Sequence, residues 1–336
     1  MKQIAAIVLA AGKGTRMKSE KPKVLFKIAE KMLVQRVIDA AEELKPNKIA
    51  VVVGYKKDEV IKRLNHYSNT VFIEQKEQNG TGHAVIVTKK EFENFEGNIL
   101  LLCGDVPLLK AKTLKKLVEK HNKKNAACTV LTAIMDDALK YGRIVRNKDN
   151  SVKQIVEFKD ANQEQRKIKE INTGIYCFNA NDLFNSLNQI SNNNKQNEYY
   201  LTDTLEILNK EGKLVSSVIV DDNKEVSGVN SQLQLANLEN KLYKEIKKYW
   251  LSNGVSIENP DTVIIGENVK IEPEVYIAAN NIIKGNTVIR KGSYIGPNCY
   301  LNNTAIKQNS ILKGFNVFKN CQLPVNSVYD FYEKDY

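Results

Sequence analysis

The sequence predicts an α/β domain, with a mostly parallel sheet and helices on both of its faces, followed by a short parallel β-helix. Short β-branched runs alternate with amphipathic stretches from residue 4 to about residue 135, and a glycine-rich loop follows the first run. From residue 265 an aliphatic residue recurs every six positions. Continuous apolar strands separated by helices indicate a parallel sheet that is buried on both faces. A six-residue aliphatic period indicates a β-helix.

The elements of the first half follow from these patterns. Strands are expected at residues 4–9, 49–53, 70–74, 99–103 and 127–133, and helices at residues 33–44, 57–64, 83–92 and 112–122. In such sheets ligands bind beyond the carboxyl ends of the strands. The glycine loop after the first strand and Asp105 after the fourth lie at such ends.

The second half carries the six-residue repeat. Its aliphatic positions are Ile265, Ile271, Ile277, Ile283, Ile289, Ile295 and Leu301, after which the register slips by one and continues through Ile306, Leu312 and Phe318. In a three-sided prism these side chains point inward, with about eighteen residues per coil. We therefore expect an α/β domain at residues 1–230, a helical linker at 231–251, a β-helix at 252–328 and a tail at 329–336.

Composition narrows the class of protein. The chain has 336 residues, 26% charged and 42% hydrophobic, with a formal net charge of +11. The lysines are scattered and form no basic stripe with aromatics, which argues against a nucleic-acid partner. No apolar run reaches the length of a membrane span. The five cysteines are far apart and without C-x-x-C spacing, so neither a disulfide framework nor a zinc site is indicated. We expect a cytoplasmic protein without a membrane partner.

Residues 8–27, VLAAGKGTRMKSEKPKVLFK, join the first strand to a glycine loop. Gly12 and Gly14 allow a tight turn and bring main-chain N–H groups close to phosphate oxygens, while Arg16 and Lys23 supply positive charge. Met17 stands where a dinucleotide-binding fingerprint needs its third glycine, and the Walker pattern is absent too. The loop therefore predicts a polyphosphate site of another kind.

Two further segments follow strands. Asp105, in ILLLCGDVP, is either a turn residue or a Mg²⁺ ligand, because carboxylate oxygens suit this hard cation. The segment QKEQNGTGH begins at Gln75 and either caps the next helix or recognises a base. In the second interpretation Gln75 and Gln78 contact a pyrimidine edge, and Gly80 and Thr81 allow close approach.

The string LAAGxGTRM followed by KPK resembles the sugar-phosphate nucleotidylyltransferases. The motifs QxxQxGTGHA, GDVPLL, YGRIV, IVEFKDA, EINTGI, EYYLTD and GVNSxLQL occur in that order. Together they resemble N-acetylglucosamine-1-phosphate uridylyltransferase, the first half of a bifunctional enzyme, over residues 4 to about 325. The resemblance implies a Rossmann-like nucleotidylyltransferase domain and a left-handed β-helix.

The resemblance also implies roles for individual residues. Leu9, Ala10, Ala11 and Gly12 would line the uridine and ribose, with Gln75, Gly80 and Thr81 at the base; Arg16 and Lys23 would contact phosphates; Asp105 and Asn230 would hold Mg²⁺; Gly142, Glu157, Asn172 and Thr202 would bind the sugar. Each has an ordinary structural alternative. Asn230 could cap the linker helix, Gly142 could be a turn residue, Glu157 a paired surface charge and Asn172 a loop residue.

The implied reaction transfers UMP from UTP to N-acetylglucosamine 1-phosphate, giving UDP-N-acetylglucosamine and pyrophosphate by in-line attack. Beyond residue 121 the sequence contains no histidine, so we expect no acetyltransferase activity. The β-helix is expected to form a homotrimer. Two alternatives remain open: a related enzyme with another sugar or base, and a non-catalytic scaffold subunit.

Overall fold

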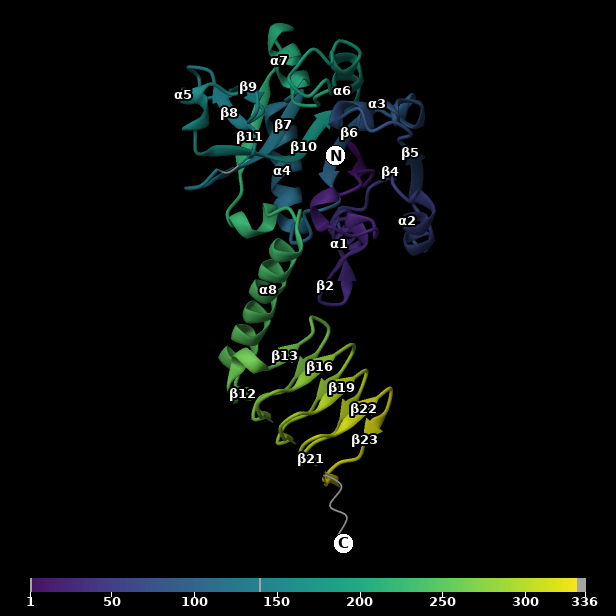
Figure 1. The fold of residues 1–336 in the computed structure, drawn as a ribbon, viewed down its shortest axis with the longest axis vertical. Coiled ribbons are helices and arrows are strands. Elements are labelled where there is room, and N and C mark those ends of the chain that lie inside the picture. Colours follow the sequence, from purple (N-terminus) through teal and green to yellow (C-terminus); the bar gives the residue numbers. More distant parts are fainter. Residues whose placement is uncertain (1, 139, 331–336) are drawn as a thin grey trace. The chain divides into compact units, whose positions relative to one another are not determined.

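The computed structural model describes residues 2–138 and 140–330, which form two compact units. The first unit extends to Gln232 apart from Ile28–Glu30, and the second contains Ile28–Glu30 and the chain from Leu233. Figure 1 shows the fold and labels many of its elements. The expected combination of an α/β domain with a parallel β-helix is confirmed.

The first unit is built on one mixed sheet with the strand order β11-β7-β10-β6-β1-β4-β5. Its strands are β1 (Gln3–Leu9), β4 (Ile49–Val53), β5 (Thr70–Glu74), β6 (Gly97–Cys103), β7 (Cys128–Ile134), β10 (Glu170–Asn179) and β11 (Val215–Ile219). Strand β10 runs antiparallel to both of its neighbours, whereas the other pairs along this path are parallel. The hairpin of β8 (Arg143–Arg146) and β9 (Val152–Val156) joins the sheet through β10. The parallel strands bring their carboxyl ends to one edge of the sheet.

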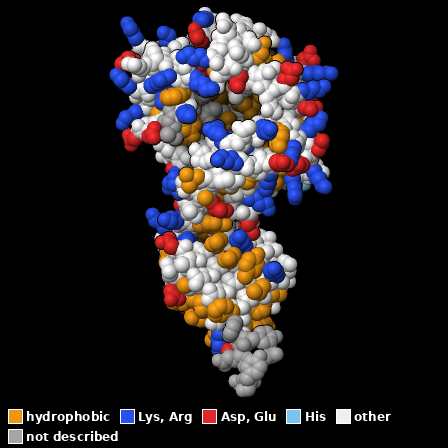
Figure 2. Space-filling view, viewed as in Figure 1, with side chains coloured by type: hydrophobic (Ala, Val, Ile, Leu, Met, Phe, Trp, Pro, Cys, Tyr) orange, Lys and Arg blue, Asp and Glu red, His pale blue; other side chains and the backbone are white. Residues whose placement is uncertain are grey.

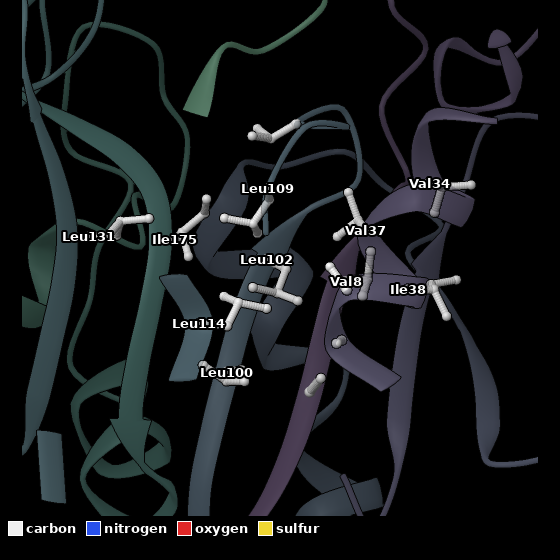
Figure 3. Close-up of a cluster of buried hydrophobic side chains, with 14 of the residues drawn as sticks. Val8, Val34, Val37, Ile38, Leu100, Leu102, Leu109, Leu114, Leu131 and Ile175 are labelled. Atoms are coloured by element: carbon white, nitrogen blue, oxygen red, sulfur yellow. The ribbon is translucent and has the colours of Figure 1, made fainter. Parts of the chain in front are cut away.

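Both faces of the sheet are buried. Successive side chains of a strand point to opposite sides of the sheet, so one strand contributes to the apolar cluster on each face. In β1, Ala6 and Val8 belong to one apolar cluster, and Ala5 and Ile7 to another. Figure 3 shows the first cluster, in which Val8 and residues of β6 lie near the side chains of α1 (Leu33–Glu42). These continuous apolar strands explain why the sequence pattern alone predicted a doubly covered sheet.

Helices cover each face of this sheet. The first cluster receives residues from α1, α2 (Lys57–Leu64) and α4 (Ala111–Lys124), and the second from α3 (Thr81–Ile86), α6 (Ala180–Leu187) and α7 (Asp203–Lys210). The remaining short elements are the hairpin β2 (Lys27–Ile28) and β3 (Lys31–Met32), helix α5 (Gln163–Arg166), and the 3₁₀ helices η1 (Thr15–Met17), η2 (Lys23–Leu25), η3 (Lys89–Phe92) and η4 (Asn223–Val226).

The helix expected at residues 83–92 is divided in the structure. Helix α3 begins at Thr81 and ends at Ile86, and the 3₁₀ helix η3 follows. Thr88 donates from both its main-chain N–H and its hydroxyl to the carbonyl oxygen of Val85. This local hydrogen bonding competes with a further α-helical turn. Thr88 also follows a run of β-branched residues, which have low helix propensity.

The second unit contains helix α8 (Gln232–Ser252), the 3₁₀ helix η5 (Pro260–Thr262) and stacked parallel strands (Figure 1). The strands form three ladders. The first contains β12 (Ser256–Ile257), β15 (Tyr276–Ile277), β18 (Tyr294–Ile295), β21 (Ile311–Leu312) and β24 (Val328–Tyr329). The second contains β13 (Ile264–Ile265), β16 (Ile282–Lys284), β19 (Tyr300–Asn302) and β22 (Val317–Lys319), and the third contains β14 (Lys270–Ile271), β17 (Val288–Ile289), β20 (Ala305–Ile306) and β23 (Gln322–Leu323). The aliphatic repeat fills the interior as predicted, with Ile265, Ile283 and Leu301 fully buried. Among the described residues, none of the helices combines the length and apolarity that a membrane span requires.

The register slip after Leu301 has a structural counterpart. Ile283 pairs with Leu301, 18 positions later, whereas Leu301 pairs with Phe318, 17 positions later. Coils that include the slip are therefore one residue shorter. The inward positions remain aligned, since Ile306 and Leu312 are fully buried.

Candidate active site

The chain after β1 forms the glycine loop and leads into η1. Gly14 has a φ angle of 67°, in the left-handed region that glycine adopts without strain. A side chain at Gly14 would place its Cβ 2.6 Å from the Cβ of Lys23. The glycine therefore allows the segment that carries Lys23 to pack against the loop. At Gly12 a Cβ would meet no other atom of the described chain within 4 Å, so this part of the loop faces open space.

Charged and amide groups from three distant segments meet beside the loop. The Nζ atom of Lys23 forms an ion pair with Oδ2 of Asp105 and lies 3.1 Å from Oδ1 of Asn230. The Nη2 group of Arg16 donates to the same Asn230 oxygen at 2.8 Å. Lys23 and Asp105 are both largely shielded from solvent, with side chains 15% and 21% exposed. The structure thus brings together the four residues expected at the phosphates and the metal.

This cluster borders a cavity of about 290 Å³. The cavity is lined by Leu9, Ala10, Ala11, Gly12, Lys23, Val24, Gln75, Gln78, Gly80, Thr81, Ala84, Cys103, Asp105 and Glu198. All seven residues expected around the nucleoside are among them. Figure 2 shows a hollow in the surface of the first unit, with Lys and Arg side chains near its rim.

The part of the cavity around Gln75 and Gly80 is held by hydrogen bonds between two loops. Gln75 is buried, and its Nε2 group lies 3.2 Å from the carbonyl oxygen of Gly80 and 3.2 Å from Nδ1 of His83. Gly80 has a φ angle of 105°, and a Cβ there would lie 2.6 Å from the carbonyl oxygen of Tyr199. Gly82 donates its N–H to that same oxygen at 2.8 Å. Only glycine at position 80 permits this close approach of the two loops.

The four residues expected at the sugar also converge. The N–H of Asn172 donates to the carbonyl oxygen of Gly142 at 2.9 Å, and a Cβ at Gly142 would lie 3.4 Å from Oε1 of Glu157 and 3.5 Å from Cβ of Asn172. The hydroxyl of Thr202 donates to Oε1 of Glu157 at 3.4 Å. Burial raises the pKa of the Glu157 carboxyl above its usual value, although the hydrogen bond from Thr202 opposes the shift. Glu157 is therefore a partly desolvated acceptor and not a surface charge.

The chain matches the nucleotidyl transferase family model over residues 5–254. It belongs to this family. Curated relatives named bifunctional protein GlmU support the more specific resemblance in the sequence motifs. The relative from Limosilactobacillus reuteri is 42% identical over 279 residues, which are 83% of this chain and 61% of the relative. The relative from Clostridium tetani is 45% identical over 280 residues, again 83% of this chain and 61% of the relative. The chain therefore spans about three fifths of the length of these relatives.

Solved structures agree on the fold. The crystal structure of a UDP-glucose pyrophosphorylase in complex with UDP-glucose has a TM-score of 0.58 and 22% sequence identity, and covers 73% of this chain and all of that chain. The structure of an apo UDP-glucose pyrophosphorylase has a TM-score of 0.56 over the same shares. At this identity the likeness concerns the fold alone. It agrees with the nucleotidyltransferase fold expected from the motifs.

The oxygens of Asp105 and Asn230 fit a shared divalent cation. Both oxygens accept a hydrogen bond from the ammonium of Lys23, so both already face one positive charge. A carboxylate and an amide oxygen are hard ligands of the kind Mg²⁺ prefers, and Mg²⁺ in phosphoryl-transfer sites takes its other ligands from phosphates and water. Among the described residues there is no group of three or more His, Cys, Asp or Glu side chains suited to a metal. The residues therefore fit a cation that is completed by substrate, not one enclosed by protein.

Some residues of this candidate site were not singled out in the sequence. Glu198 lines the cavity, and the neighbouring Tyr199 fixes the Gly80 loop. Cys103 also lines it, and its Sγ donates to the carbonyl oxygen of Gly174 at 3.3 Å. Burial raises the pKa of the Cys103 thiol to about 12, so the thiol keeps its proton. The motif EYYLTD includes Glu198 and Tyr199, but their contacts depend on packing between segments more than a hundred positions apart.

Proposed function

We propose that this nucleotidyltransferase transfers UMP from UTP to N-acetylglucosamine 1-phosphate, with Mg²⁺, and releases pyrophosphate. The observation that carries the proposal is the cluster of Lys23, Arg16, Asp105 and Asn230, of which Lys23 and Asp105 line the cavity beside the glycine loop. Two polyanions must approach each other in this reaction, and such a cluster supplies charge where they meet. The proposed use of UTP implies a cytoplasmic enzyme.

In the proposed mechanism an oxygen of the sugar phosphate attacks the α-phosphorus of UTP, and the bond from that phosphorus to pyrophosphate breaks. Lys23 and Arg16 neutralise phosphate oxygens and hold them in place. Asp105 and Asn230 provide the protein oxygens of the Mg²⁺ site. Mg²⁺, when bound, supplies charge that offsets the repulsion between the phosphate groups. No side chain acts as a general base, because the attacking phosphate is already ionised.

The nucleoside and sugar are assigned to opposite ends of this site. Leu9–Gly12 in the loop would line the uridine and ribose, and Gln75, Gly80 and Thr81 would contact the base. Glu157 and Asn172, with Gly142 and Thr202, would bind the sugar. The buried carboxylate of Glu157 favours a partner that donates hydrogen bonds, such as a hydroxyl or an amide N–H.

Product analysis tests this assignment. The purified chain is incubated with Mg²⁺ and either UTP or dTTP, together with the 1-phosphate of N-acetylglucosamine, N-acetylgalactosamine or glucose, and products are identified by mass spectrometry. The proposal predicts UDP-N-acetylglucosamine as the main product. A preference for dTTP or for glucose 1-phosphate would transfer the assignment to a related enzyme, and no product with any pair would favour a scaffold subunit.

We also propose that the β-helix forms a homotrimer. One ladder of the prism presents Tyr276, Tyr294, Ile311 and Val328 outward in register, each between 39% and 54% exposed. Figure 2 shows apolar side chains over the visible face of the second unit. Sedimentation velocity should give a trimer, and Tyr294→Glu should shift it toward the monomer because a charge would be buried at the contact. A monomeric wild-type chain would refute this assembly.

The β-helix of this chain is further proposed to lack acetyltransferase activity. Residues 252–330 contain no histidine, and so no imidazole that could act as a general base there. Incubation with glucosamine 1-phosphate and acetyl-CoA should leave free coenzyme A at background level. Release of coenzyme A above that level would contradict the proposal.

A further inference from the structure

The side-chain oxygen of Asn172 accepts two hydrogen bonds from its own strand. The N–H of Gly174 donates to Oδ1 at 3.0 Å, and the hydroxyl of Tyr176 donates to the same atom at 2.9 Å. A main-chain N–H can only donate, so the contact with Gly174 requires that the oxygen, and not the nitrogen, of the amide lies there. The N–H donor of Gly174 therefore fixes which way the Asn172 amide is turned.

A bulge in β10 makes the second contact possible. In a regular strand Asn172 and Tyr176 would lie about 13 Å apart on one face. The pairing of β10 with β7 shifts register between these two residues, and Gly174 within the bulge has a φ angle of 78°. The thiol of Cys103 donates to the carbonyl oxygen of Gly174 and so anchors the bulge to β6. The irregular strand brings the Tyr176 hydroxyl to the side chain of Asn172.

Tyr176 is suited to be a fixed donor. It is 1% exposed, and its ring packs against Phe178 with centroids 5.5 Å apart. Burial, together with the nearby charge of Glu157, raises the pKa of Tyr176 well above its ordinary value. Its hydroxyl therefore keeps its proton at neutral pH and remains a donor.

We propose that Tyr176 is a positioning residue that locks the Asn172 amide with its nitrogen as a donor toward the sugar. Among the described residues, Nδ2 of Asn172 has no hydrogen-bond partner, whereas Oδ1 has two. Glu157, an acceptor, borders the same space in front of Gly142. A donor beside an acceptor complements the C=O and N–H groups of an acetamido substituent. This inference rests on the proposed function and deepens it.

The test is the kinetics of Tyr176→Phe, which keeps the ring and removes the hydroxyl. We expect the KM for N-acetylglucosamine 1-phosphate to rise about fivefold, as for the loss of one hydrogen bond, while the KM for UTP stays within twofold of wild type. In an Asn172→Ala background the same substitution should change the sugar KM less than twofold, since the group that Tyr176 positions is gone. Tyr67→Phe is the matched control, because the Tyr67 hydroxyl donates to Asp39 outside the site.

The outcomes distinguish failure of the positioning role from failure of the proposed function. A sugar KM that Tyr176→Phe leaves unchanged, or an equal effect with and without Asn172, overturns the positioning role. An equal rise in both KM values, together with a lowered melting temperature, also overturns it in favour of a general packing role. A wild-type enzyme that does not use N-acetylglucosamine 1-phosphate refutes the proposed function itself, and with it this inference. Selective loss of sugar affinity that requires Asn172 supports both.

Discussion

The Nζ atom of Lys23 lies 3.1 Å from Oδ1 of Asn230, across 207 positions of the chain. The same ammonium pairs with Asp105, which follows a different strand. Asp105 therefore offsets the positive charge of Lys23 within the site. Under the proposed function, a polyphosphate that enters the site would compete with Asp105 for Lys23, and this competition would have measurable consequences.

Replacement of Asp105 by Asn should separate binding from turnover. Without Mg²⁺, UTP should bind this variant at least as tightly as wild type, because Lys23 no longer has a carboxylate partner and a negative charge is removed. With saturating Mg²⁺, kcat should fall on the order of 10²-fold or more, as for other preorganised charge-stabilising groups. Calorimetry with UTP and EDTA, together with a pyrophosphate-release assay, measures both effects.

Lys23→Ala should lower kcat by a similar factor, of about 10²-fold or more, and should also weaken UTP binding. Lys27→Ala is its control, since Lys27 lies exposed on the same segment and loses the same charge. Equal activity of the two lysine variants would show that net charge, and not the position of Lys23, matters. Near-normal turnover of Lys23→Ala would contradict the assignment of this residue.

Two glycines of the cavity should respond differently to Ala. At Gly12 a Cβ meets no other described atom within 4 Å, so Gly12→Ala should leave the melting temperature of the free protein unchanged and raise the KM for UTP about tenfold or more. At Gly80 a Cβ would meet the carbonyl oxygen of Tyr199 at 2.6 Å in a backbone region with positive φ. Gly80→Ala should therefore cost roughly 1–3 kcal/mol of stability. A destabilised Gly12→Ala protein would mean that the space in front of Gly12 is not reserved for a ligand.

The affinity for UDP-N-acetylglucosamine should fall on acidification at a pH above the ordinary carboxyl range. Burial raises the pKa of Glu157, and only its ionised form accepts hydrogen bonds at both oxygens. The ligand favours this ionised form, so protonation of Glu157 weakens binding. Titrations between pH 7.5 and 4.5 suit this test, because the diphosphate of the ligand does not change charge in that range. Glu157→Gln should bind more weakly at pH 7.5 and lose this pH dependence; an unchanged profile in that variant would assign the effect to another group.

Acid should destabilise the first unit through His121. This side chain is 1% exposed, and among the described residues its Nε2 has no hydrogen-bond partner. Burial lowers its pKa from 6.5 to about 4. The unfolded chain therefore binds a proton between these two values while the folded chain does not, so the free energy of unfolding falls as the pH falls through this window. The total loss is about 3 kcal/mol.

Urea denaturation at pH 7.0, 5.5 and 4.5 measures this contribution. His121→Gln should lose less stability over the range than wild type, since glutamine does not titrate. His66→Gln is the control, because it removes an exposed imidazole that lies outside the buried core. Parallel pH profiles for wild type and His121→Gln would contradict the prediction.

Much of the fold could be predicted because its elements are locally encoded. Strands β1, β4 and β5 are mostly apolar or β-branched, and the β-helix repeats its inward position every six residues over most of its length. Strand β10 could not be predicted in this way. Its sequence EINTGIYCFN mixes polar residues with a glycine, and its antiparallel place between β6 and β7 depends on contacts distant in the chain.

The residues of the candidate site likewise fall into those that the local sequence predicts and those that it does not. The glycine loop and Asp105 could be inferred from strand ends and the chemistry of phosphates. Asn230 and Asn172 were expected only from the family resemblance, since nothing local distinguishes them from ordinary loop residues. Tyr176 could not have been identified, because a buried tyrosine in a strand has the pattern of a core residue. Only the bulge at Gly174 gives its hydroxyl a partner.

The most direct measurement is the rate of pyrophosphate release from UTP and Mg²⁺ with N-acetylglucosamine 1-phosphate, compared with glucosamine 1-phosphate in the presence and absence of acetyl-CoA. The proposed function predicts turnover with the acetylated sugar, and little with glucosamine 1-phosphate under either condition. Silence with both sugars would contradict it. So would strong turnover of glucosamine 1-phosphate that requires acetyl-CoA, since this chain would then carry its own acetyl-transfer site.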